Sequence, residues 1–111
     1  EPGLLDWQLV RIGDGIGDLA YLLGTALSTA DRRRHEEELL TLYRTSSGLE
    51  LCPSELAQRY TQHLVYPFEA MLLTLAIGGL MPTPANHTLL ERATQAVLDH
   101  DSFGVLLGAS A

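Results

Sequence analysis

Residues 4–23, LLDWQLVRIGDGIGDLAYLL, place an aspartate on each side of a glycine-containing segment and then continue as an apolar run. The glycines between Asp6 and Asp18 give the backbone the freedom of a loop. A carboxylate costs free energy to bury unless a hydrogen bond, an opposite charge or a metal satisfies it. Any fold of this chain must therefore provide partners for these two aspartates.

The same stretch predicts a short strand, a loop and a buried helix. The apolar run at residues 3–6 ends in an acid, as a buried strand often does, and residues 7–17 form the loop. Asp18 begins the helix, because an acidic residue in the first turn faces the positive end of the helix dipole. Apolar side chains cover most of the circumference of residues 18–28, which predicts a helix buried on every side.

Two further helices are expected in the middle of the chain. The first spans about residues 30–47 and ends at Gly48, where a glycine can adopt the left-handed conformation. The second runs from Pro53 toward Ile77, and Pro67 is expected to kink it or split it in two. Its inward stripe is predicted to consist of Leu56, Tyr60, Leu64, Phe68, either Met71 or Leu72, and Leu75.

A last amphipathic helix is expected at residues 88–100, after a turn at residues 78–86 (GGLMPTPAN). The length of 111 residues suits one domain, and 46% hydrophobic residues argue against disorder. We therefore expect a mainly α fold that forms a single unit over residues 1–111.

Composition excludes several partners. Fourteen acidic residues against seven basic ones give a net charge of −7, which is unsuited to binding nucleic acid. Residues 64–81 are apolar, but Glu69 and Pro67 interrupt them, so a buried core helix is expected rather than a membrane span. No secretory leader opens the sequence, which favours a cytoplasmic location.

The single cysteine, Cys52, is expected to be a small buried hydrophobe.

The block RRRHEEE at residues 32–38 pairs each arginine with a glutamate four residues later. It can be interpreted as an anion- or partner-binding patch or as a solvated helix face. The solvated face is the expected one, because charge runs on helices usually face water.

Two familiar loops do not fit residues 6–18. A calcium-binding EF-hand loop that starts at Asp6 would need acids where Gln8 and Val10 stand. A dinucleotide-binding fingerprint would need a third glycine where Asp18 stands.

Residues 3–27 instead resemble the C-terminal lobe of the aminoglycoside phosphotransferase, choline kinase and ecdysteroid-kinase-like group of small-molecule kinases. In that group an apolar strand ends in Asp-Trp or Asp-Phe followed by Glu or Gln. A glycine-containing loop comes next, and Asp-Leu-Ala begins a buried helix. The letters DWQ at residues 6–8 and DLA at residues 18–20 carry the resemblance.

The resemblance implies an ATP- and Mg²⁺-dependent phosphotransferase that acts on a hydroxyl group of a small molecule. Asp6 would be the metal- and cofactor-binding aspartate, because magnesium bridges the nucleotide phosphates in phosphoryl transfer. Trp7 would pack and fix the loop, and Asp18 would accept hydrogen bonds from the backbone of the catalytic loop. The fold implied is the C-lobe part of a protein-kinase-like α+β fold. In it, residues 1–17 form the metal-loop strand and glycine loop, and residues 18–111 form a helical subdomain of about four helices.

The group's catalytic loop, His-Gly-Asp with a later Asn, is absent from these 111 residues, and so is any lysine. The chain alone is therefore expected to be inactive and to need the missing N-terminal part of the same kinase as its partner. The alternative is a non-catalytic acidic helical interaction module or a pseudokinase. Without the resemblance, Asp6 would be a strand-end or turn residue and Asp18 an ordinary helix cap.

Tyr60, His63 and Tyr66 recur at threefold spacing and are candidates for lining the acceptor pocket. The alternative makes the tyrosines core or rim residues and His63 a solvated or capped histidine. The four histidines have no zinc-type companion motif, so the sequence indicates no zinc site.

Overall fold

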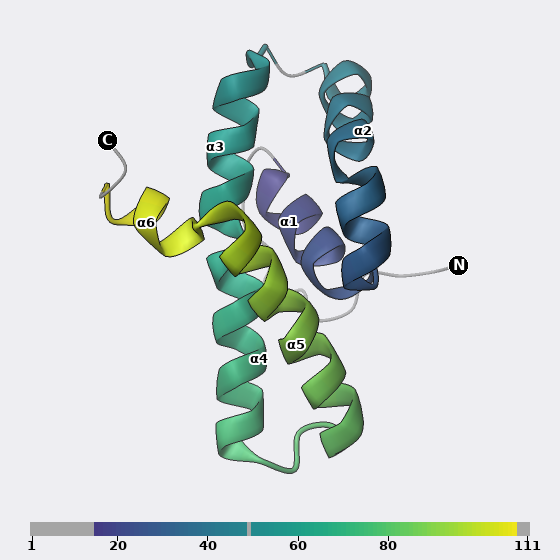
Figure 1. The fold of residues 1–111 in the computed structure, drawn as a ribbon, viewed down its shortest axis with the longest axis vertical. Helices are drawn as coiled ribbons and strands as arrows, with labels where there is room; N and C mark the ends of the chain where they lie inside the picture. Colours follow the sequence, from purple (N-terminus) through teal and green to yellow (C-terminus); the bar gives the residue numbers. More distant parts are fainter. Residues whose placement is uncertain (1–14, 49, 109–111) are drawn as a thin grey trace.

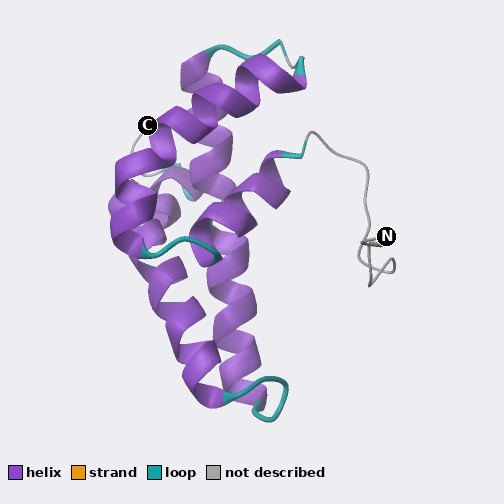
Figure 2. Ribbon diagram, turned by 90° about the vertical axis from the view of Figure 1, so that its right-hand side faces the viewer, coloured by secondary structure: helices purple, strands orange, loops and turns teal. Residues whose placement is uncertain are grey.

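The computed structural model describes residues 15–48 and 50–108. This part of the chain is mainly α, as predicted, and contains helices and connecting loops but no strand (Figures 1 and 2). Its helices are α1 (Ile16–Thr25), α2 (Thr29–Ser47), α3 (Pro53–His63), α4 (Val65–Ile77), α5 (Thr83–His100) and α6 (Ser102–Leu106). The predicted strand at 3–6 and residues 7–14 of the predicted loop lie outside the described residues.

Helix α1 occupies the middle of the bundle, between α2 and α3 in Figure 1, and it also contacts α4 and α5. Helices α3 and α4 follow one another in a nearly continuous column, and α5 returns beside α4 (Figure 1). The core lies where α1, α3 and α5 meet. Its buried side chains are Ile16, Ala20, Leu23, Leu56, Tyr60, Leu64, Ala96 and Val97.

Helix α1 begins two residues before the predicted start, because Gly15 adopts a left-handed φ of 82° and acts as its N-cap. The helix is not buried on every side, contrary to the prediction. Asp18, Leu22 and Ala26 are exposed at i, i+4 and i+8, and Leu22 is 57% exposed. One face of α1 is therefore uncovered along its length, and Asp18 lies at the N-terminal end of that face.

Helix α2 confirms the prediction for residues 30–47. The backbone N–H of Asp31 donates a hydrogen bond to Ser28 Oγ over 3.2 Å, so Ser28 is the cap. Gly48 ends the helix with a φ of 76°, a conformation that favours glycine.

The predicted split at Pro67 is also confirmed. Helix α3 ends at His63, four residues before the proline, which is where the ring would clash with a helical carbonyl group. Met71 rather than Leu72 completes the inward stripe of α4. The prediction of a buried core helix at 64–81 holds for only one side of α4, because Met71 is buried whereas Leu73 and Ile77 are 61% and 69% exposed. Among the described helices, none is long and apolar enough to span a membrane.

Helix α5 begins at Thr83, five residues before the predicted start. Pro84 fits in its first turn, where no intrahelical N–H bond is lost. Asn86 Nδ2 donates a hydrogen bond to the Met71 carbonyl group over 3.1 Å, which fastens this turn to α4. The short helix α6 was not predicted. Cys52 is exposed, so the expected buried cysteine is wrong.

Candidate functional site

Asp18 is the member of the predicted acid pair that the structure describes; Asp6 and Trp7 lie outside the described residues. The Asp18 side chain is exposed in the first turn of α1, two residues after the helix start at Ile16. No hydrogen bond or ion pair joins it to another described residue. Within the described residues, the Asp18 side chain is thus exposed at the N-terminal end of α1.

The three candidate pocket residues do not form one group. Tyr60 is fully buried on α3 and contacts α2 and α5, whereas His63 is the half-buried last residue of α3. Tyr66 lies on α4, is 51% exposed and packs its ring 5.7 Å from that of Tyr21. Burial, assisted by the neighbouring Tyr66, raises the pKa of Tyr21.

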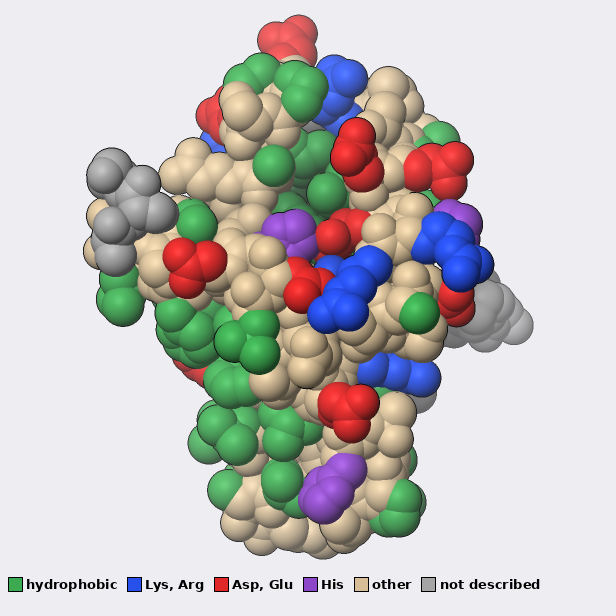
Figure 3. Space-filling view, in the orientation of Figure 1, with side chains coloured by type: hydrophobic (Ala, Val, Ile, Leu, Met, Phe, Trp, Pro, Cys, Tyr) green, Lys and Arg blue, Asp and Glu red, His purple; other side chains and the backbone are tan. Residues whose placement is uncertain are grey.

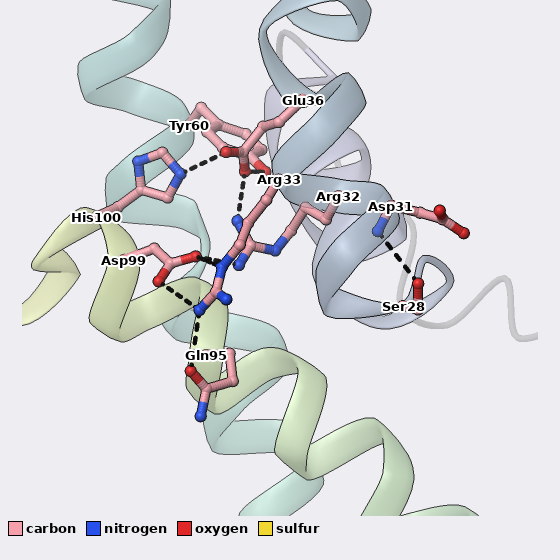
Figure 4. Close-up of polar contacts among 9 residues, drawn as sticks. All are labelled: Ser28, Asp31, Arg32, Arg33, Glu36, Tyr60, Gln95, Asp99 and His100. Atoms are coloured by element: carbon pink, nitrogen blue, oxygen red, sulfur yellow. Dashed lines mark hydrogen bonds and ion pairs between the residues drawn. The ribbon is translucent and has the colours of Figure 1, made fainter.

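A polar network that the sequence did not predict joins α2, α3 and α5 (Figure 4). We call it the Glu36 cluster. Its members are Arg32, Arg33, Glu36, Tyr60, Asp99 and His100.

Glu36 lies at the centre of this cluster. Its Oε1 atom is 2.8 Å from His100 Nε2. Its Oε2 atom accepts hydrogen bonds from Arg32 Nη1 over 3.1 Å and from the Tyr60 hydroxyl group. One buried carboxylate thus joins its own helix, α2, to both α3 and α5.

Asp99 forms the second half of the cluster, at the C-terminal end of α5. It accepts a hydrogen bond from Arg32 Nη2 over 2.5 Å. Arg33 binds it through two nitrogens, with Nε 2.8 Å from Oδ2 and Nη2 3.0 Å from Oδ1. Bidentate arginine–carboxylate contacts are the stronger kind of ion pair, so Asp99 fixes the position of α2 on α5.

The electrostatics follow from these contacts. Burial raises the pKa of Glu36, but hydrogen bonds with His100 and Tyr60 and the charge of Arg32 outweigh it, so the pKa lies below its ordinary value. The hydrogen bond from Arg33 is the main reason why the pKa of Asp99 falls to about 2. Burial and the bond to Glu36 raise the pKa of Tyr60.

Every carboxylate oxygen in the cluster already has a partner, and Arg32, of which only 1% is exposed, lies between the two acids. The arrangement therefore suits holding helices together rather than activating a substrate. The prediction of a solvated face is wrong for Arg32 and Glu36 but holds for Arg34, Glu37 and Glu38, which are exposed.

One sequence signal pointed to this burial. Arg32 and Glu36 share a helix face with Leu40 and Tyr43, which pack against the core. Figure 3 shows the outcome on the surface. Charged side chains gather in the middle of the visible face, and hydrophobic side chains cover its lower left, over α4.

The described residues contain no group of three or more His, Cys, Asp or Glu side chains that could hold a metal ion. His100, Glu36 and Asp99 lie near one another, but arginine groups neutralise the two acids. Asp6, the predicted magnesium ligand, is outside this part of the chain.

The family described as "Uncharacterized oxidoreductase dhs-27" matches residues 2–97 of the chain, and the chain belongs to this family. No curated protein and no solved structure shows a significant match to the chain.

Proposed function

We propose that this family member is part of an ATP- and Mg²⁺-dependent phosphotransferase that phosphorylates a hydroxyl group of a small molecule. The observation that carries the proposal is the position of Asp18. It lies on the first turn of a helix whose opposite side packs in the core, and its side chain is exposed at the N-terminal end of that helix. This is the arrangement that the small-molecule kinase resemblance requires of the aspartate that supports the catalytic loop.

Asp6, which precedes Asp18 by twelve residues, would hold magnesium, because a carboxylate oxygen is the hard ligand that this ion prefers. The ion, when bound, neutralises charge on the nucleotide phosphates. Trp7 would pack beside the metal loop. Helices α1 to α6 would form the helical subdomain next to the acceptor pocket, with Tyr60 supporting that subdomain from within.

The description of the family names an oxidoreductase. The glycine segment at residues 13–18 does not complete a G-x-G-x-x-G phosphate cradle, because Asp18 stands where the third glycine should be. We prefer phosphoryl transfer because the letters at residues 6–8 and 18–20 carry the small-molecule kinase resemblance.

The second candidate is a non-catalytic helical interaction module. It is favoured by the outer side of α4, where Leu72, Leu73 and Ile77 are between 45% and 69% exposed. Large exposed apolar surfaces usually mark a contact with another protein or domain. The phosphotransferase proposal explains the same surface if the rest of the kinase covers it.

The test begins with the protein that contains this sequence. The phosphotransferase proposal requires a His-Gly-Asp-x-x-x-x-Asn segment before residue 1 and magnesium-dependent ATP consumption with an alcohol acceptor. A parent protein that lacks this segment and consumes no ATP with a panel of small-molecule alcohols would leave the interaction module as the correct assignment.

A further inference from the structure

Helix α6 is joined to α5 through a strained residue. Asp101 has a φ of 48° and is the one non-glycine residue with positive φ in the described part of the chain. The left-handed conformation is unfavourable for most residues with a Cβ atom, although aspartate adopts it more readily than most. The closed position of α6 therefore depends on contacts that compensate for this cost.

Ser102, the first residue of α6, adds a second cost. Its side chain is fully buried, and its Oγ atom has no hydrogen-bond partner in the described structure. A buried hydroxyl group without a partner destabilises the state that buries it, whereas water satisfies it in an open state. Moving α6 away from the bundle would therefore satisfy this group.

Helix α6 is held in place by contacts with α3, α4 and α5. The Phe103 and Phe68 rings, on α6 and α4, pack nearly perpendicular to each other with centroids 5.8 Å apart, and α6 also contacts α3 and α5. Leu106 and Leu107 at the far end are 49% and 79% exposed. A helix of five residues has almost no stability of its own, so its order depends on this docking.

We propose that α6 is a hinged flap that opens about Asp101 while α1 to α5 remain folded. Opening relaxes the left-handed residue, exposes Ser102 Oγ to water and uncovers Phe68 together with the adjoining side of α3. The closed flap covers this apolar surface, and the open flap makes it accessible. The inference does not depend on the proposed phosphotransferase activity.

Amide hydrogen exchange of the 111-residue chain tests the flap. We expect the protected amides of α6 to exchange through an opening at least about a hundredfold more frequent than the global unfolding that exposes the core amides of α1, α3 and α5. Identical opening constants for α6 and for the core helices, with the same denaturant dependence, would show that α6 belongs to the global unit and would overturn the proposal.

Two substitutions should shift the flap in opposite directions. Ser102→Ala removes the unpartnered hydroxyl group, so the opening constant of α6 should fall about tenfold. Gly104→Ala should raise it, because a Cβ atom there would lie 2.3 Å from Asp101 Oδ2. Ser46→Ala, at an exposed position on α2, is the matched control and should leave α6 exchange unchanged. A rise in opening with Ser102→Ala would contradict the proposal.

Thiol labelling gives a second measurement that does not depend on amide protection. In a Cys52→Ser background, a Ser102→Cys thiol should react much faster than a thiol introduced at core position 96 by Ala96→Cys. Both positions are fully buried in the closed structure. Equal labelling rates would show that the two sites become exposed only by global unfolding.

Discussion

His100 Nε2 lies 2.8 Å from Glu36 Oε1, so the last residue of α5 is bound to the middle of α2 across 64 residues of sequence. Glu36 simultaneously pairs with Arg32, which is almost completely buried. Helix α2 carries a run of seven charged or titratable residues, and two of them, Arg32 and Glu36, are buried. The Glu36 cluster consequently stabilises the bundle by joining α2 to α3 and α5.

Replacing Glu36 with Gln keeps the shape of the side chain but removes its charge. Arg32 then keeps Asp99 as its counter-ion but loses its charged bond to Glu36, so the free energy of unfolding should fall by about 2 kcal/mol. Urea denaturation of the variant measures this. Glu37→Gln, one residue away and exposed, should change stability by less than about 0.5 kcal/mol. Equal effects of the two substitutions would contradict the structural role of Glu36.

Tyr60→Phe removes one hydrogen-bond donor from Glu36 and retains the buried ring. We expect a loss of about 1 kcal/mol in unfolding free energy. The same change in a Glu36→Gln background should cost less, because the charged acceptor is already gone. A double-mutant cycle from denaturation curves measures the coupling, and strictly additive effects would argue against the Tyr60–Glu36 bond.

The free energy of unfolding should decrease at acid pH because the carboxylates of Glu36 and Asp99 become protonated. The pKa of Glu36 and the pKa of Asp99 are both lowered in the folded state, the latter to about 2. The unfolded chain therefore binds more protons as the pH falls. The stabilisation is fully present above the ordinary pKa values, 4.5 for Glu36 and 3.8 for Asp99, and is lost as the pH falls toward 2. Denaturation at several pH values checks this. Asp99→Asn should flatten the dependence between pH 4 and 2, and an unchanged slope would contradict it.

Gly15 is required for two reasons, which two variants can separate. Its φ is 82°, and a Cβ atom there would lie 2.7 Å from the Tyr43 hydroxyl oxygen. Gly48 has a similar φ of 76° but open space around it. Gly48→Ala should therefore cost about 1–2 kcal/mol for backbone conformation alone. Gly15→Ala should cost more, and thermal unfolding should rank the two accordingly; the reverse order would show that Tyr43 does not constrain the start of α1.

Local chemistry explains which parts of the fold were predictable. The end of α2 at Gly48 and the break before Pro67 depend on the backbone preferences of single residues, and both were predicted. The early start of α5 was missed, because residues 78–86 have the composition of a turn, and the hydrogen bond from Asn86 to the Met71 carbonyl group on α4 is a tertiary contact that the sequence does not show. Helix α6 has five residues, which is too short for a helical repeat of apolar residues to be recognised in the sequence.

The Glu36 cluster was missed for a different reason. The i, i+4 spacing pairs Arg33 with Glu37, but Arg33 binds Asp99, 66 residues away, and only tertiary packing brings the two together. The i, i+4 spacing correctly indicated the Arg32–Glu36 pair, but only the helix face that the pair shares with Leu40 and Tyr43 indicated its burial. The exposed side of α1 was also not predictable from the sequence. An apolar residue such as Leu22 does not show by itself whether another helix covers it.

The most direct test of the phosphotransferase proposal is magnesium-dependent ATP turnover by the full-length parent protein carrying Asp6→Asn. Asparagine retains the shape of the side chain but removes the charge that would hold magnesium, so turnover should fall by a factor on the order of 10² or more, with an unchanged melting temperature. Asp14→Asn, the same substitution within the same glycine-containing segment, should retain activity. Full activity of Asp6→Asn, or an equal loss in both variants, would contradict the proposal.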